Sequence, residues 1–146
     1  MSYAVQSDIV DRFGEELLYQ IADRDRDQQL ETAAIELALA DASAEVDTYL
    51  SQRYTVPLDP TPRVVVRLAV DIAVYRLAQK AQAYTEEIRQ RYEDAIELLV
   101  RMAKGTAGLG EAAEETGAGG EIKGGQILPT DNPERVFSRK TMKGLP

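Results

Sequence analysis

Residues 36–77 most constrain what this chain can fold into, because two apolar helical segments flank a proline-rich turn there. In the first segment, apolar side chains recur every three or four residues, which is the spacing of one helix face. We predict a helix over about Thr32–Arg53, whose apolar face consists of Ile35, Ala38, Leu39, Ala42, Val46, Tyr49 and Leu50. Three prolines end it, since proline lacks an amide hydrogen and biases the preceding residue toward extended backbone. They are Pro57, Pro60 and Pro62.

The second segment is predicted to be a helix that starts near Thr61 or Pro62 and is apolar around most of its circumference up to Leu77. Arg63, Arg67 and Asp71, each four residues apart, form its one polar stripe, and we expect this stripe to contribute to folding or to assembly. Two interpretations remain open: a central helix of one domain, or a helix that partly meets another subunit. The candidate residues for subunit packing are Val65, Leu68, Ile72, Leu39 and Val46.

Three further helices are predicted, over about Asp8–Phe13, Glu15–Ile21 and Thr85–Lys104. Ser7 and Thr85 are the expected N-caps of the first and last of these, because a side-chain hydroxyl can accept an amide hydrogen bond there. Gly14 and Gly105 are the expected ends. The chain has few aromatic residues, so the core should be aliphatic. Residues 1–104 therefore form one all-α domain, a small bundle of about four to five helices.

The composition changes after Gly105. Residues 105–125 are rich in Gly and Glu, which is typical of a flexible linker. Residues 126–146 regain apolar side chains and are predicted to form an extended arm, with one short strand as an option. Such an arm needs a partner to bury its apolar residues. Its candidate residues for docking on a partner protein or on a neighbouring subunit are Val136, Phe137, Arg139, Lys140 and Lys143.

The side chains that most enzymes use are missing. The chain has no histidine and no cysteine, so the commonest general base, the commonest metal ligand and all thiol chemistry are excluded. Asp23, Asp25 and Asp27 have the spacing of calcium-loop ligands, but the sixth and twelfth positions of that loop are Gln28 and Ala34 instead of Gly and Glu. We therefore predict no catalytic residues, no metal site, no cofactor and no enzymatic activity.

Charge separates the body of the chain from its arm. Residues 1–104 carry 12 basic and 19 acidic side chains, whereas residues 133–146 carry four basic and one acidic. An acidic body repels phosphates and disfavours tight DNA binding. The arm could bind an acidic protein surface. The start of the chain is polar, unlike a signal peptide, and its most apolar run contains Arg67, Asp71 and Arg76, so we expect neither secretion nor membrane insertion.

Several blocks of the sequence resemble a known family in their order and spacing. The blocks are SYAVQSDIVDRFGEELL, ALADASAEVDTYLSQRYTVPL, VVVRLAVDIAVYRL, RYEDAIELLVRMAKG and DNPERVFSRKTMKGL. Together they resemble the small head–tail connector proteins of tailed bacteriophages, also called head-completion or neck proteins, and most closely those of Mu-like phages and prophages. Residues 105–125 contribute least to the resemblance.

The resemblance implies a ring of such subunits, commonly twelve, in the neck of the virion. The ring would sit below the portal protein, extend the DNA channel without sequence-specific binding, and offer a platform for a downstream neck or tail-terminator protein. It would be assembled in the bacterial host cytoplasm. The family defines no active-site residues, so none are assigned here. The alternative is a small helical regulator, from the host or a prophage, that binds DNA or protein.

Overall fold

Helix α4 (Arg63–Lys80) lies at the centre of the protein and packs against the other four helices. The computed structural model describes residues 1–23, 25 and 27–110. The other helices of this part are α1 (Gln6–Phe13), α2 (Glu15–Ala22), α3 (Thr32–Leu50) and α5 (Glu86–Ala103). No strand occurs within these residues. The predicted all-α bundle is therefore confirmed, while the linker after residue 110 and the arm with its optional strand lie outside the described residues.

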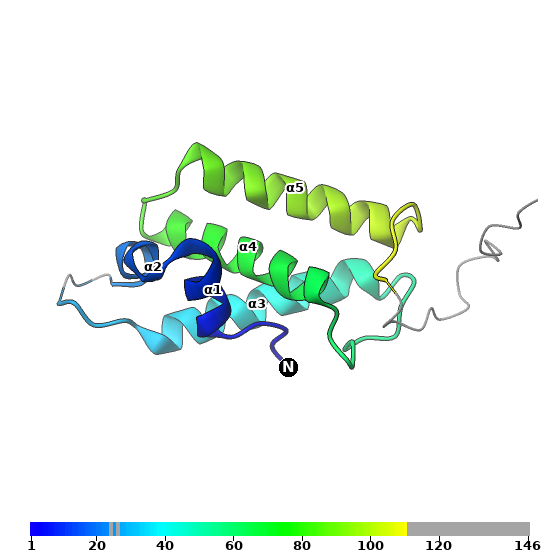
Figure 1. Ribbon diagram of the computed structural model, residues 1–146, viewed down its shortest axis with the longest axis horizontal. Helices are drawn as coiled ribbons and strands as arrows, with labels where there is room; N and C mark the ends of the chain where they lie inside the picture. Colours follow the sequence, from blue (N-terminus) through cyan, green and yellow to red (C-terminus); the bar gives the residue numbers. More distant parts are fainter. Residues whose placement is uncertain (24, 26, 111–146) are drawn as a thin grey trace, which may run out of the picture.

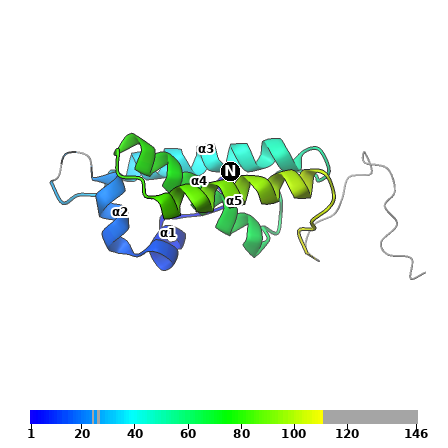
Figure 2. The ribbon, with the colours of Figure 1, turned by 90° about the horizontal axis from the view of Figure 1, so that it is seen from above.

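The three long helices run in alternating directions, with α4 between α3 and α5, and the short helices α1 and α2 cover one end of the bundle (Figure 1). Seen from above, α3 forms one long edge of the molecule (Figure 2). Tyr75 of α4 stacks on Tyr92 of α5, with ring centroids 4.1 Å apart. Among the helices of residues 1–110 that the structure describes, none packs against the side of α3 that points away from α4.

The core belongs to a single chain. Ten of the 18 residues of α4 are buried. A helix that is covered on nearly all sides needs apolar side chains on nearly all sides, which explains its sequence. All five candidates for subunit packing are at most 3% exposed; they are Val65, Leu68, Ile72, Leu39 and Val46. Their packing partners are residues of the same protomer. Within this chain the five candidates are therefore core residues, and α4 is the central helix of one domain.

The helix ends agree with the sequence in most places and differ in two. Thr85 caps α5, and its hydroxyl accepts the Ile88 amide at 3.3 Å. Ser7, by contrast, lies inside α1, so its predicted role as N-cap was wrong. The N-cap is Val5, whose amide donates to the Asp8 carboxylate at 2.8 Å. Helix α3 also ends earlier than predicted, because a tight turn follows Leu50.

Gly14 and Gly105 end α1 and α5 as predicted, and both have positive φ. At Gly105 the amides of Gly105 and Thr106 bond back to the carbonyls of Met102 and Arg101, a pattern that needs a left-handed residue. A Cβ at Gly105 would also overlap the Arg53 guanidinium. The close approach places the C-terminal end of α5 beside the turn that follows α3. The described chain then ends at Gly110, after the buried Leu109.

Tyr3 anchors the N-terminal segment to α3. Its amide donates to the Ser43 hydroxyl at 2.9 Å, and its phenol donates to the Asp47 carboxylate. The same phenol oxygen accepts the Leu58 amide at 3.0 Å. One buried side chain thus joins the N-terminus, α3 and the proline-rich turn. Burial and the hydrogen bond to Asp47 together raise the pKa of Tyr3 to about 12.

Candidate interaction surfaces

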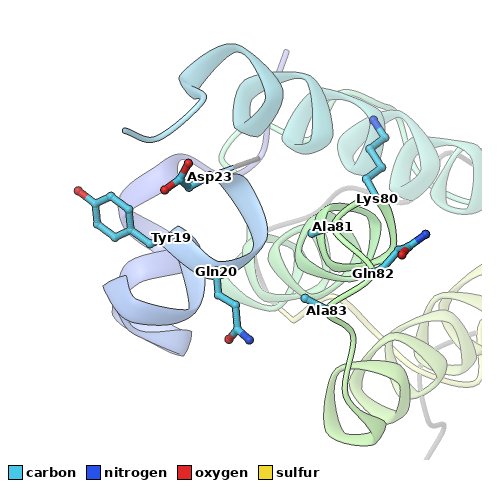
Figure 3. Close-up of a pocket in the computed structure, with 7 residues that line it drawn as sticks. All are labelled: Tyr19, Gln20, Asp23, Lys80, Ala81, Gln82 and Ala83. Atoms are coloured by element: carbon cyan, nitrogen blue, oxygen red, sulfur yellow. The ribbon is translucent and has the colours of Figure 1, made fainter. Parts of the chain in front are cut away.

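An open groove separates the end of α2 from the end of α4 (Figure 3). Its volume is about 860 Å³, and its lining residues are Tyr19, Gln20, Asp23, Lys80, Ala81, Gln82 and Ala83. Gln82 has φ of +55°, and the amide of Ala83 reaches back to the Ala78 carbonyl, so a left-handed turn ends α4 at the groove. This turn is what makes room between the two helix ends.

One exposed tyrosine lines this groove, and a second follows a lining residue in the sequence. The Tyr19 side chain lines it and points away from α4 (Figure 3), and Tyr84 follows the lining residue Ala83 directly. Tyr19 is 37% exposed and Tyr84 is 57% exposed. Tyrosine is enriched at protein–protein contacts, because its ring buries a large area and its hydroxyl stays polar. The groove is therefore a candidate contact for another protein rather than an enclosed pocket for a small molecule.

A second candidate is the outer face of α3, which we define as Ala33, Leu37, Ala40 and Ala44. These residues recur at helical spacing and are all exposed, with Leu37 at 55%. Exposed apolar side chains that continue over several turns of one helix are unusual on a surface that faces only water. The same helix carries Glu36, Asp41, Glu45 and Asp47, and no basic residue lies between Glu31 and Leu50. The face is thus apolar along its middle and acidic at its margins.

The exposed side of α5 has a different character, because its charges are paired within the helix. Arg89 lies 2.5 Å from Glu86 and 3.1 Å from Glu93, and Arg91 lies 2.9 Å from Glu87. Glu97 and Arg101 form the ion pair that their spacing predicts. Pairs of this kind add little stability but keep a helix face well solvated. The α5 side therefore gives no sign of a covering partner, in contrast to the outer face of α3.

Asp71 is a charged group buried in the bundle. It is 8% exposed, and its Oδ1 atom accepts no hydrogen bond. A cavity of about 120 Å³ beside it is lined by Arg67, Leu68, Asp71, Arg91, Asp94 and Ala95. Burial raises the pKa of Asp71, although the positive charges of Arg91, Arg67 and Arg12 lower it in part. The ionised carboxylate is therefore disfavoured in the folded chain.

Replacing Asp71 with asparagine is expected to stabilise the protein at pH 7. The pKa of Asp71 is higher in the folded chain than in the unfolded chain. At pH values between these two pKa values, the folded chain therefore binds more protons than the unfolded chain. Stability is therefore lost as pH rises through that range, and Asp71→Asn removes this loss. Urea unfolding at pH 7 and near pH 4 should show a gain at pH 7 that shrinks in acid. Asp59→Asn, at an exposed aspartate of the proline-rich turn, is the control, and a less stable Asp71→Asn protein at pH 7 contradicts the argument.

The aspartate loop after α2 uses its carboxylates for its own backbone. Asp23 accepts the amides of Asp27 and Gln28 at 3.2 and 2.9 Å, and Asp27 accepts the amide of Gln29 at 2.8 Å. Within residues 1–23, 25 and 27–110, no group of three or more His, Cys, Asp or Glu side chains could hold a metal ion. None of the helices in that part of the chain is long and apolar enough to cross a membrane.

The sequence-based candidates were not the residues that form these surfaces. The five packing candidates lie in the core, and the docking candidates Val136, Phe137, Arg139, Lys140 and Lys143 lie outside the described residues. The outer face of α3 could have been found in the sequence, since Ala33, Leu37, Ala40 and Ala44 continue the helical spacing on a second side. The groove could not, because it depends on how α2 and α4 meet.

Comparisons with known proteins match nearly all of the chain. The model of the family "Bacteriophage Mu, Gp36" matches residues 3–124. The Mu-like prophage FluMu protein gp36 of Haemophilus influenzae is 35% identical over 143 residues, which cover 98% of this chain and 97% of the relative. Gene product J of Escherichia phage Mu is 32% identical over 142 residues, or 96% of each chain. The chain therefore belongs to the bacteriophage Mu Gp36 family.

Proposed function

We propose that this protein is a structural subunit of a phage virion, and that it forms a ring in the neck, at the junction of head and tail. The ring sits below the portal protein, commonly with twelve copies, and lets the genome pass. Its outer end receives a downstream neck or tail-terminator protein. The protein has no enzymatic activity and needs no cofactor. It assembles in the host cytoplasm and stays in the virion.

The observation that carries this proposal is the end-to-end similarity to proteins of phage Mu and of a Mu-like prophage. The similarity covers the whole length and is not confined to one short motif. It therefore supports a shared role for the helical body and for the residues that follow it. Among the roles open to a phage protein, a structural one fits a body without histidine or cysteine. The network of surface ion pairs on α5 also suits a scaffold.

Charge supports a channel role over DNA recognition. The described body is rich in carboxylates, and α3 in particular has four acidic residues and no basic residue. Tight DNA binding requires several basic side chains on the phosphates. A wall that repels phosphates lets a duplex slide instead. Because subunits in a ring meet through two different surfaces, the tyrosine-flanked groove between α2 and α4 is our candidate for one of these.

The test measures assembly of the full chain, alone and with its portal protein, by native mass spectrometry and electron microscopy. We expect the protein to form rings either alone or when the portal protein is added. A chain truncated after residue 125 should keep its helical circular dichroism but lose portal attachment. A body that stays monomeric and unattached in the presence of the portal would reject the connector role. Binding of the isolated protein to short DNA duplexes at physiological salt would instead favour a regulator.

Variants at the groove separate ring formation from folding. Tyr19→Asp combined with Tyr84→Asp should reduce ring formation at least tenfold, because it places two charges where a partner would exclude water. Gln90→Asp, on the exposed side of α5, is the matched control and should assemble normally. Since both sites are exposed, the unfolding midpoint of each variant should stay close to that of the parent. Normal rings from the double variant would remove the groove from the contact.

A further inference from the structure

We propose that the basic C-terminal segment, residues 126–146, lies on the outer face of α3. The outer face is the row Ala33, Leu37, Ala40 and Ala44 with its acidic margins. The proposal goes beyond the connector role, because it concerns a contact that the protein makes with its own chain or with another copy of it before any portal is met.

The shape and polarity of the outer face suit an extended chain. Three of its four residues are alanines, so a peptide backbone can come close to the helix between them. Leu37 projects at the middle of the row and is 55% exposed. The segment 126–146 offers apolar side chains of its own, above all Val136 and Phe137. Burying Leu37 against such residues would remove apolar surface from water on both sides.

The charges of the two surfaces are opposite. Around the outer face, Glu36 and Asp41 are exposed, while Arg76 of α4 holds Glu45 at 2.5 Å and lies 4.0 Å from Asp41. Residues 133–146 carry Arg135, Arg139, Lys140 and Lys143 against one Glu. On α5, by contrast, Glu86, Glu87, Glu93 and Glu97 are paired with arginines of the same helix. Of these two helices, α3 is therefore the one that offers a basic segment carboxylates without an arginine on the same helix, together with an apolar strip between them.

The segment can reach this face from where the described chain ends. Gly105 contacts the region of Arg53, so the chain leaves the body beside the C-terminal end of α3. From Leu50 back to Leu37 is about 20 Å at 1.5 Å per residue. A flexible linker of the length of residues 111–125 spans about 20 Å on average. Exposed ion pairs are individually weak, so a segment held in this way can also be transferred to a portal protein.

Cysteine cross-linking tests the contact in the full chain, since the chain has no cysteine of its own. Leu37→Cys is combined with Phe137→Cys, and a short bismaleimide reagent joins thiols that come close. The control pair combines Gln90→Cys, on the exposed side of α5, with the same Phe137→Cys. We expect at least tenfold more cross-linking in the Leu37 pair. Mixing the two single variants shows whether the segment comes from the same chain or from another copy, and either result supports the contact.

Charge reversal provides the second test. Glu36→Lys with Asp41→Lys should reduce the Leu37 cross-link severalfold, whereas Glu93→Lys with Glu97→Lys on α5 should not. Circular dichroism and urea unfolding verify that each variant folds. Equal cross-linking of the Leu37 and Gln90 pairs would overturn the proposal. Leu37→Cys chains that link only to one another would also overturn it, because the outer face of α3 would then contact α3 of a second copy. Ring formation, measured by native mass, is a separate readout, so a failure of this contact leaves the connector role intact.

Discussion

Replacing Ile72 with alanine is expected to lower the free energy of unfolding by about 3–4 kcal/mol. Ile72 is fully buried in α4, at the centre of the bundle. Its truncation leaves a cavity in a close-packed core, which the surrounding side chains cannot fill without moving. Urea unfolding followed by circular dichroism measures the loss. For a domain of this size it is a large part of the total stability.

The control for Ile72→Ala distinguishes a core residue from a subunit contact. Val5→Ala removes more exposed surface than buried surface, since Val5 is 58% exposed, so it should change the stability of the isolated chain by less than about 0.5 kcal/mol. The loss at Ile72 should also be the same at all protein concentrations, since all of its packing partners belong to one chain. A loss that disappears in dilute solution would mean that Ile72 stabilises an assembly instead of the protomer.

The sequence predicted the helices well because their signals are local. The spacing of apolar residues predicted α3, α4 and α5. Single residues with clear preferences marked helix ends: Gly14 the end of α1, Thr85 the start of α5 and Gly105 the end of α5. Where two local signals competed, the prediction failed. Ser7 looked like the cap of α1, yet the carboxylate of Asp8 bonds the amide of Val5 and starts the helix two residues earlier.

The surfaces were harder to predict because they depend on which side of a helix the rest of the bundle covers. An all-round apolar helix is equally compatible with a core and with an interface, and only packing showed that α4 is the core. Because α4 is buried in the core, the candidate contact residues are the exposed residues of α3. The position of Asp71 shows the same limit, since a polar stripe on a helical wheel did not reveal that its carboxylate is buried without a partner for Oδ1.

Replacing Tyr3 with phenylalanine is expected to cost about 2 kcal/mol of stability, because one hydroxyl serves two partners. Its loss leaves the Leu58 amide and the Asp47 carboxylate without their bonds to Tyr3. The partners lie 44 and 55 residues away in sequence, so no local pattern predicts this anchor. Urea unfolding at pH 8 measures the cost. Tyr19→Phe, at an exposed tyrosine, is the control and should leave stability nearly unchanged.

The pH dependence of the Tyr3→Phe effect separates the anchor from a simple loss of packing. The pKa of Tyr3 is raised to about 12 in the folded protein, whereas an unfolded tyrosine titrates near 10. Between these values the unfolded chain releases its proton first, so the stability that the phenol supplies is complete below about pH 10 and is lost as pH rises toward 12. The difference between the parent and Tyr3→Phe should therefore narrow from pH 9 to pH 11. A difference that stays constant over this range would mean that the hydroxyl stabilises the fold without its proton being held by Asp47.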